Sequence, residues 1–304
     1  MKLGFVTEIL PELSFEEVLE FAASEGFACV EVMCWPQGKA DRRFAGITHI
    51  DVAGLDKSRA KEILQLCEKY GVEISGLGYY PNPLDPDPDK SRAVVEHLKA
   101  VIRAAPLLGL RNVNTFVGRD WHKSIEENWP RFLKIWKPII ALAEKHDARI
   151  GIENCGMLYT EDEWPGGKNL AMCPAIWRRM FADIPSKHFG LNYDPSHPLL
   201  LRFDPYEPLH EFRDKLFHIH AKDIRFDEKA ANDWGIMGLP KAYHHPRIPG
   251  FGMLDWGRFI GGLMQVGYNG PVCIEVEDDT FGKSLEGRQN ALRVAGNVLR
   301  PFFP

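Results

Sequence analysis

Four short apolar segments in the second half of the chain end in side chains that can bind a divalent metal. Glu153 closes "GIE", Asp194 follows "LNY", His220 closes "FHIH" and Glu275 follows "VCI". Carboxylate and imidazole ligands together suit Mn²⁺, Mg²⁺, Co²⁺ or Zn²⁺. If the four side chains converge, the three carboxylates repel one another unless a cation neutralises them, because buried like charges are costly. The residue types therefore predict one divalent metal site, provided that the fold brings the segments together.

The elements that must position these residues alternate along the chain. Short apolar runs follow longer segments with helical spacing of apolar residues. Ser14 and Glu17 have the pattern of a helix-starting capping box, and Gly26 suits the end of the same helix. Strands are predicted at 2–7, 28–34, 72–78, 112–117, 149–154, 189–194, 216–221 and 271–276. Helices are predicted at 14–25, 58–70, 91–108, 124–146, 174–183, 205–213, 255–266 and 282–300.

Eight strand–helix units predict an α/β fold, the closed (β/α)8 or TIM barrel, with a parallel sheet. No linker or low-complexity segment divides the chain, so 1–304 is expected to form one domain. The rival open sheet calls for a glycine-rich phosphate turn after an early strand, and "FVTEILPELS" has no GxGxxG. In a barrel the carboxyl ends of all strands share one rim, which is where the four metal-binding side chains would meet.

Bulk composition narrows the class of protein. The 304 residues are 45% hydrophobic and 26% charged, which is typical of a globular chain. The net charge of -5 argues against a nucleic-acid partner, which usually requires a basic face. No apolar stretch is long enough for a membrane span, and the N-terminus lacks the pattern of a signal peptide. With six cysteines and no CxxC pair, we expect a reduced, cytoplasmic protein.

Two histidines stand two residues apart in "FHIHAKD", so they share one face of the predicted strand. His220, nearer the strand end, is the expected metal ligand. His218 is expected one layer deeper, as a core residue or as support for the ligands, with a role as a second ligand as the alternative. Asp223 could orient His220 and Lys222 could reach the substrate, or these two side chains could simply pair at the surface.

The sequence resembles the xylose isomerase-like TIM barrels over nearly its whole length. "DPSH", "HIHAKD" and "PGFGMLDW" carry the resemblance together, and "ENCGM" and "NLAMCP" add to it. The most similar group is that of the sugar phosphate isomerases and epimerases, which includes ketose 3-epimerases and inositol-pathway enzymes. The resemblance identifies Glu153, Asp194, His220 and Glu275 with the family's Glu-Asp-His-Glu metal set. It implies one divalent metal per chain, with Mn²⁺ expected first and Mg²⁺, Co²⁺ or Zn²⁺ as alternatives.

The resemblance also implies isomerisation or epimerisation of a keto sugar or related polyol. The reaction would remove a proton next to a carbonyl through a metal-bound enediolate, with the metal as Lewis acid. Glu153 and Glu275 are the expected catalytic residues, one removing the proton and the other returning it. The same first step followed by loss of a β-substituent would make the protein a lyase, either like inosose dehydratase or a deglycosidase of 3-keto-glycosides. A deglycosidase would work with a small partner subunit.

Substrate specificity is expected in two loops, 34–51 after the second strand and 225–252 after the seventh. His197 resembles a substrate-contacting or metal-adjacent histidine of relatives, or it caps a turn. The other candidate substrate contacts are Lys222, Arg247, Trp35, Tyr79 and Asn114. Apolar groups of the second loop could exclude water from a keto sugar, inosose or oxidised glycoside, or they could form a homo-oligomer contact. No glycine-rich loop follows the last strands, so no phosphate site is assigned.

Two further classes remain as alternatives. DNA-repair endonucleases of the same superfamily hold three zinc ions, which would require histidines on the second and third strands. "VEVMCW" and "ISGLGYY" offer none there. A barrel that is merely stabilised by a metal is the other alternative, because fold does not fix function.

Overall fold

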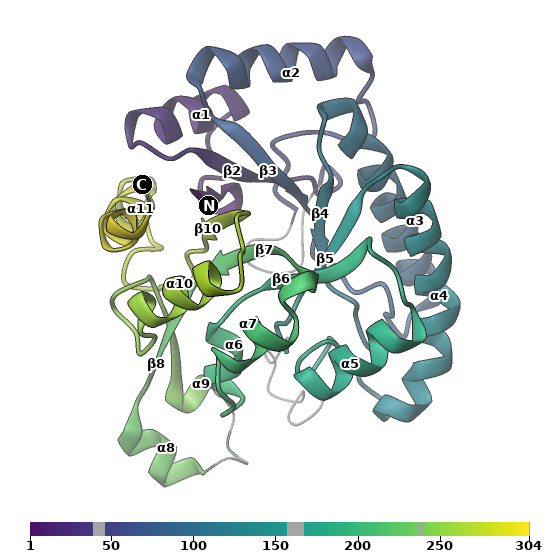
Figure 1. Cartoon of the computed structure of the whole chain (residues 1–304), viewed down its shortest axis with the longest axis vertical. Helices are drawn as coiled ribbons and strands as arrows, with labels where there is room; N and C mark the ends of the chain where they lie inside the picture. Colours follow the sequence, from purple (N-terminus) through teal and green to yellow (C-terminus); the bar gives the residue numbers. More distant parts are fainter. Residues whose placement is uncertain (39–45, 157–166, 236–237, 239, 304) are drawn as a thin grey trace.

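Eight parallel strands close into a barrel that is surrounded by helices (Figure 1). The computed structural model describes residues 1–38, 46–156, 167–235, 238 and 240–303. The strand order around the barrel is β1-β10-β7-β6-β5-β4-β3-β2. The barrel strands are β1 (Lys2–Val6), β2 (Cys29–Met33), β3 (Glu73–Gly78), β4 (Asn112–Thr115), β5 (Arg149–Glu153), β6 (Phe189–Tyr193), β7 (Leu216–Ala221) and β10 (Pro271–Ile274). The predicted (β/α)8 barrel is confirmed, and each predicted strand lies within a few residues of an observed one.

The main helices also lie where the apolar spacing places them. The capping box at Ser14 forms, with the Glu17 amide donating to the Ser14 side chain, and Ser124 and Glu127 repeat the arrangement at the start of another helix. The helices between barrel strands are α1 (Phe15–Ser24), α2 (Lys57–Tyr70), α3 (Pro88–Ala104), α4 (Ile125–Lys145), α5 (Pro174–Asp183), α6 (Ser196–Leu200), α7 (Glu207–Glu211), α10 (Trp256–Gln265) and α11 (Leu285–Leu299).

An excursion after β7 has its own secondary structure, which the sequence patterns did not predict. It comprises β8 (Asp223–Phe226), α8 (Glu228–Trp234), α9 (Pro240–Tyr243) and β9 (His244–Arg247), and β8 pairs antiparallel with β9. Ile224, Phe226 and Tyr243 form a small apolar cluster of its own. The excursion projects from one end of the barrel, with α8 at its far end (Figure 1).

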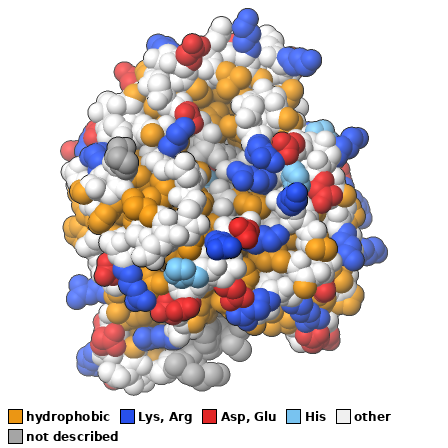
Figure 2. All heavy atoms as spheres, in the orientation of Figure 1, with side chains coloured by type: hydrophobic (Ala, Val, Ile, Leu, Met, Phe, Trp, Pro, Cys, Tyr) orange, Lys and Arg blue, Asp and Glu red, His pale blue; other side chains and the backbone are white. Residues whose placement is uncertain are grey.

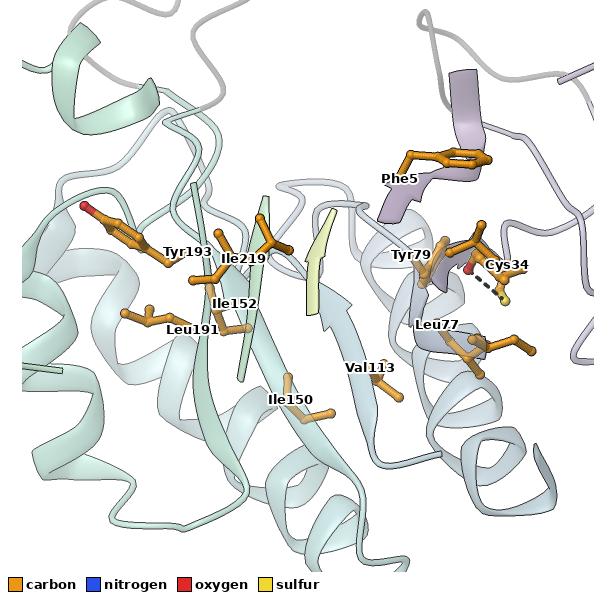
Figure 3. Packing of buried hydrophobic residues seen from close by; sticks show 14 of the residues in the cluster. Phe5, Cys34, Leu77, Tyr79, Val113, Ile150, Ile152, Leu191, Tyr193 and Ile219 are labelled. Carbon is orange, nitrogen blue, oxygen red and sulfur yellow. Dashed lines mark hydrogen bonds between the residues drawn. The ribbon is translucent and has the colours of Figure 1, made fainter. Parts of the chain in front are cut away.

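Alternation along the strands separates an apolar outer layer from an interior that mixes polar and apolar side chains. Ile150, Ile152, Leu191 and Ile219 belong to the main core between strands and helices (Figure 3). The residues between them point into the barrel, where His218 of β7 reaches Ser75 of β3 on the opposite side. The carboxyl ends of β5, β6, β7 and β10 therefore present polar side chains to one shared space.

The sequence also predicts reduced cysteines and no membrane-spanning segment. All six cysteines are free thiols. Within the described ranges, no helix combines the length and apolar character that a membrane crossing requires.

Candidate metal centre

Glu153, Asp194, His220 and Glu275 meet at the carboxyl ends of β5, β6, β7 and β10. Each offers one ligand atom, and the four atoms lie within 4.8 Å of one another. The four residues are 4%, 0%, 1% and 7% exposed, respectively. The structure thus brings together the four side chains that the sequence singled out, and their role as metal ligands stays a prediction.

Lys222 lies among the same carboxylates. Its Nζ is 3.2 Å from Asp194 Oδ2, 3.0 Å from Glu275 Oε2 and 3.2 Å from Glu277 Oε2. Burial alone would lower the pKa of this ammonium, but Glu275, Glu277 and Asp194 raise that pKa well above its usual value. Lys222 is therefore a buried, charged group of the site, and the alternative of a surface pair with Asp223 is wrong.

His197, on α6, joins two of the expected ligands. Its Nε2 is 3.2 Å from Glu153 Oε1 and 3.2 Å from Asp194 Oδ2. Burial acts to lower the pKa of this imidazole, but Cys155 and Asp194 raise it, and the pKa ends well above its usual value. The side chain of His197 is thus directed at the cluster, as the first of its two alternatives requires.

The two expected catalytic carboxyls have unlike surroundings. Burial and the charge of Glu275 raise the pKa of Glu153, against the hydrogen bond from His197. Burial acts in the same direction on Glu275, but the positive charges of Lys222 and His220 outweigh it and lower the pKa of Glu275 to about 2. Different proton affinities at two neighbouring carboxyls are typical of acid–base pairs in enzymes.

The donor set fits a divalent cation. Asp194 Oδ2 and His220 Nδ1 are buried and make no hydrogen bond within the described residues, although charged groups lie 3.1–3.2 Å away. Buried polar atoms normally have partners, so such atoms call for an explanation. Lys222 supplies one positive charge to three contacting carboxylates. A divalent ion of the oxygen- and nitrogen-binding type would offset the remaining negative charge.

His218 and Asp223 have their own hydrogen bonds. His218 Nδ1 is 3.0 Å from Asn192 Oδ1, and its Nε2 is 3.0 Å from Ser75 Oγ, so both ring nitrogens are used one layer below the cluster. Asp223 accepts from Trp256 Nε1 at 2.9 Å and from backbone amides that include that of Leu254. The expectation that Asp223 orients His220 is therefore wrong, and Asp223 instead holds the segment that leads into α10.

Tyr79, a predicted substrate contact, and its neighbour Tyr80 face different parts of the structure. Tyr79 packs edge-on against Trp35 and His97, with ring centroids 5.0 and 4.6 Å apart. The next residue, Tyr80, donates its hydroxyl to Glu31 and lies 3.3 Å from His220 Nε2. Neighbouring side chains in an extended segment face opposite ways, so Tyr80 faces the cluster and Tyr79 does not. Contact of Tyr79 with substrate stays a prediction.

Asn114 and Arg247 occupy different places from the cluster. Asn114 is fully buried in the barrel, where a Cβ on Gly151 would come 2.5 Å from its Oδ1. Arg247 Nη1 is 3.0 Å from both Asp278 Oδ1 and Thr280 Oγ1. Their contact with substrate stays a prediction. Parts of the two specificity loops, at 39–45, 236–237 and 239, lie outside the described residues.

Two buried carboxyls near the cluster were not predicted. Glu31 on β2 is fully buried, and its Oε2 is 2.7 Å from His220 Nε2. Its signal was present in "CVEVM", where Glu31 shares the inward face with two apolar residues, Cys29 and Met33. Glu8, in the short helix Thr7–Ile9 after β1, has a pKa raised well above its usual value by burial and by the charges of Glu275 and Glu277.

Curated relatives include an uncharacterised protein and an inosose dehydratase. The chain is 25% identical to the uncharacterised protein YfiH of Bacillus subtilis (strain 168), over 92% of this chain and 94% of YfiH. It is 31% identical to the inosose dehydratase of Geobacillus kaustophilus (strain HTA426), over 29% of this chain and 30% of that enzyme.

Solved structures share the fold. The IolI protein with a bound zinc atom superposes with a TM-score of 0.70 at 16% identity, over 100% of this chain and 99% of that one. The D-psicose 3-epimerase of Clostridium cellulolyticum H10 superposes with a TM-score of 0.68 at 14% identity, over 99% of each chain. The family model that describes the xylose isomerase-like TIM barrel matches residues 19–300. The chain therefore belongs to the xylose isomerase-like TIM barrel family.

Proposed function

We propose that this chain is a divalent-metal-dependent isomerase or epimerase of a keto sugar or related polyol. One observation carries the proposal: the donor atoms of Glu153, Asp194, His220 and Glu275 converge within 4.8 Å at the carboxyl rim of the barrel. TIM-barrel enzymes carry their chemistry at this rim. A metal held by these four residues would supply Lewis-acid polarisation of a substrate carbonyl.

The residues of the chain then account for the proton transfers. Glu153 is the last residue of β5, and Glu275 comes directly after β10. Strands β6 and β7 lie between β5 and β10 around the barrel. The two carboxylates can therefore approach a substrate carbon from different sides, one accepting the proton and the other returning it. Return to the opposite face of the same carbon gives an epimer, and return to the neighbouring carbon gives an isomer.

His197 and Lys222 support these steps. His197 hydrogen-bonds Glu153 and so fixes the direction of one carboxylate. Lys222 places a buried ammonium beside Glu275, where it can stabilise negative charge that develops on a substrate oxygen. Tyr80 and the buried walls of the barrel keep water from the deep side of the cluster.

A lyase is the second candidate, and the similarity to inosose dehydratases favours it. Removal of the proton next to the carbonyl is common to both reactions. In a lyase the electron pair left on carbon would expel a β-substituent, either water or a glycosyl group. Basic and acidic side chains are interspersed on the face viewed in Figure 2, so the described part of this face has no basic patch of the kind that a DNA-repair endonuclease would use.

Metal content and solvent-deuterium exchange test the proposal together. The purified protein is assayed for Mn, Zn, Co and Mg, with Mn²⁺ expected first and Zn²⁺ compared because the IolI structure contains zinc. Saturated with metal in D₂O, it is then given keto sugars, inososes and 3-keto-glucosides. We expect about one metal per chain and deuterium at the carbon next to the carbonyl, and the product separates epimer, isomer and elimination.

Variants assign the roles. Glu153→Gln and Glu275→Gln should lose exchange even where excess Mn²⁺ restores their metal content. Glu144→Gln is the control, because this glutamate on α4 bonds Ser186 away from the cluster. Metal binding without exchange on any substrate would identify a barrel that is only stabilised by its metal. A wild-type protein that does not bind added divalent metal would overturn the proposal.

A further inference from the structure

We infer that Glu31 is a positioning residue that holds the ring of His220 by its Nε2 and so presents Nδ1 to the carboxylate cluster. The inference rests on the proposed metal centre and names the atom through which His220 would serve it. It also makes β2 a contributor to a site whose expected ligands come from β5, β6, β7 and β10.

The two nitrogens of His220 have unlike partners. Nε2 lies 2.7 Å from Glu31 Oε2, a short hydrogen bond to a carboxylate. Nδ1 lies 3.1 Å from Glu275 Oε2 but makes no hydrogen bond within the described parts of the chain. The closer contact, with the Glu31 carboxylate, requires hydrogen on Nε2, although Asn192 Nδ2 also lies 3.0 Å from that nitrogen. Nδ1, beside Glu275, is then the nitrogen that would give up its proton to bind a metal.

His220 could instead bind a metal together with Glu31 and His218, because these three residues also bring ligand atoms within 4.8 Å of one another. The distance between Glu31 and His220 is too short for a metal between them. At 2.7 Å, Glu31 Oε2 and His220 Nε2 are at hydrogen-bond distance, whereas two ligands of one metal at about 2.0–2.2 Å each lie farther apart at tetrahedral angles. Both nitrogens of His218 are also occupied, by Asn192 and Ser75.

The surroundings of Glu31 are built to hold its carboxylate in place. Tyr80 donates its hydroxyl to Glu31 Oε1, and Asn192 donates to that hydroxyl at 3.0 Å. Gly78 makes the necessary room, because a Cβ at this position would lie 2.7 Å from Glu31 Oε1. Such a carboxylate behind a metal-binding histidine fixes both the orientation and the tautomer of the ring.

The first test measures metal affinity in Glu31→Leu and Glu31→Gln by competition with a chromogenic chelator. Loss of such a partner typically lowers affinity about 10–100-fold, which is the result expected for Glu31→Leu. Glu31→Gln keeps an oxygen that can accept from Nε2 and should bind more tightly than Glu31→Leu. Asp120→Asn, at a buried carboxylate that pairs with Lys123 and bonds the His122 amide, serves as the control with wild-type affinity.

The second test reads the ring directly. In the zinc-loaded protein labelled with ¹⁵N-histidine, the His220 signals, identified by their absence in His220→Gln, should show a protonated Nε2 and a metal-bound Nδ1. A metal-bound Nε2, or wild-type affinity in Glu31→Leu, would overturn the inference and leave the metal centre standing. A wild-type protein that binds no divalent metal would instead overturn the proposed function, and the inference with it.

Discussion

The ammonium of Lys222 lies 3.0 Å from Oε2 of Glu275, inside the cluster that we propose to hold a divalent metal. Two cations that share carboxylates repel each other, and charges about 4 Å apart interact by about 4 kcal/mol at an effective dielectric constant of 20. If the cluster holds a metal, we expect Lys222 to weaken its binding while supplying positive charge to the reaction.

Lys222→Met should separate these two effects. We expect metal affinity to rise by about tenfold or more, because the competing charge is gone. We expect turnover at saturating metal to fall by about 10²-fold, the usual scale for loss of a group that stabilises developing charge. Isothermal titration and the exchange assay measure the two quantities. Lys229→Met on α8, where the lysine is exposed, is the control, and weaker metal binding in Lys222→Met would contradict the competition.

Tyr79 and Tyr80 offer a matched pair of neighbours. Tyr80→Phe removes the hydroxyl that bonds Glu31 and contacts His220, so metal affinity should fall several-fold. Tyr79→Phe should leave metal affinity unchanged, because that ring packs on Trp35 and His97. Chelator competition on both variants measures the difference in metal affinity. Equal effects would contradict the assignment of Tyr80 to the site and of Tyr79 to packing.

Asp223→Ala should reduce stability and leave metal affinity as it is. The carboxylate ties Trp256 and the backbone amides of Met253 and Leu254 to β8, and their loss leaves buried donors without a partner. Each unsatisfied buried group costs about 1–3 kcal/mol, so the free energy of unfolding should fall by at least that amount. Urea denaturation measures it. A selective loss of metal affinity with normal stability would restore the original expectation that Asp223 orients His220.

The barrel and the convergence of four side chains at its rim could be predicted from the sequence because both follow from short-range regularities. Strand–helix alternation gave the fold, and the strand ends gave Glu153, Asp194, His220 and Glu275. Contacts across the barrel have no such signature. That Glu31 would meet His220, 189 positions along the chain, depends on barrel closure and on a register shift between Val30 and Glu31.

The secondary structure of the loops could not be predicted for a related reason. The pairing of β8 with β9 joins Asp223 to Arg247 across two short helices, and neither four-residue strand has a clear alternating pattern. At the end of β3 the direction of Tyr79 and Tyr80 depends on where extended pairing stops at Gly78. Element boundaries carry errors of a few residues, and one residue suffices to reverse a side chain.

His49 should make the stability of the protein depend on pH. Burial lowers the pKa of this imidazole, against a hydrogen bond to the Leu10 carbonyl, so the folded state keeps it neutral below its usual pKa. The unfolded chain takes up a proton at about pH 6.5 and the folded chain does so only at lower pH. The stability that His49 contributes is therefore complete above about pH 6.5 and is lost as the pH falls toward the folded pKa.

His49→Gln isolates this effect, because glutamine can still donate to Leu10 and does not titrate. Urea denaturation of both proteins at pH 7.5 and pH 5 should show a larger loss of stability for the wild type. If the two proteins lose the same stability over this interval, then His49 titrates alike in the folded and unfolded chains, and burial does not hold it neutral.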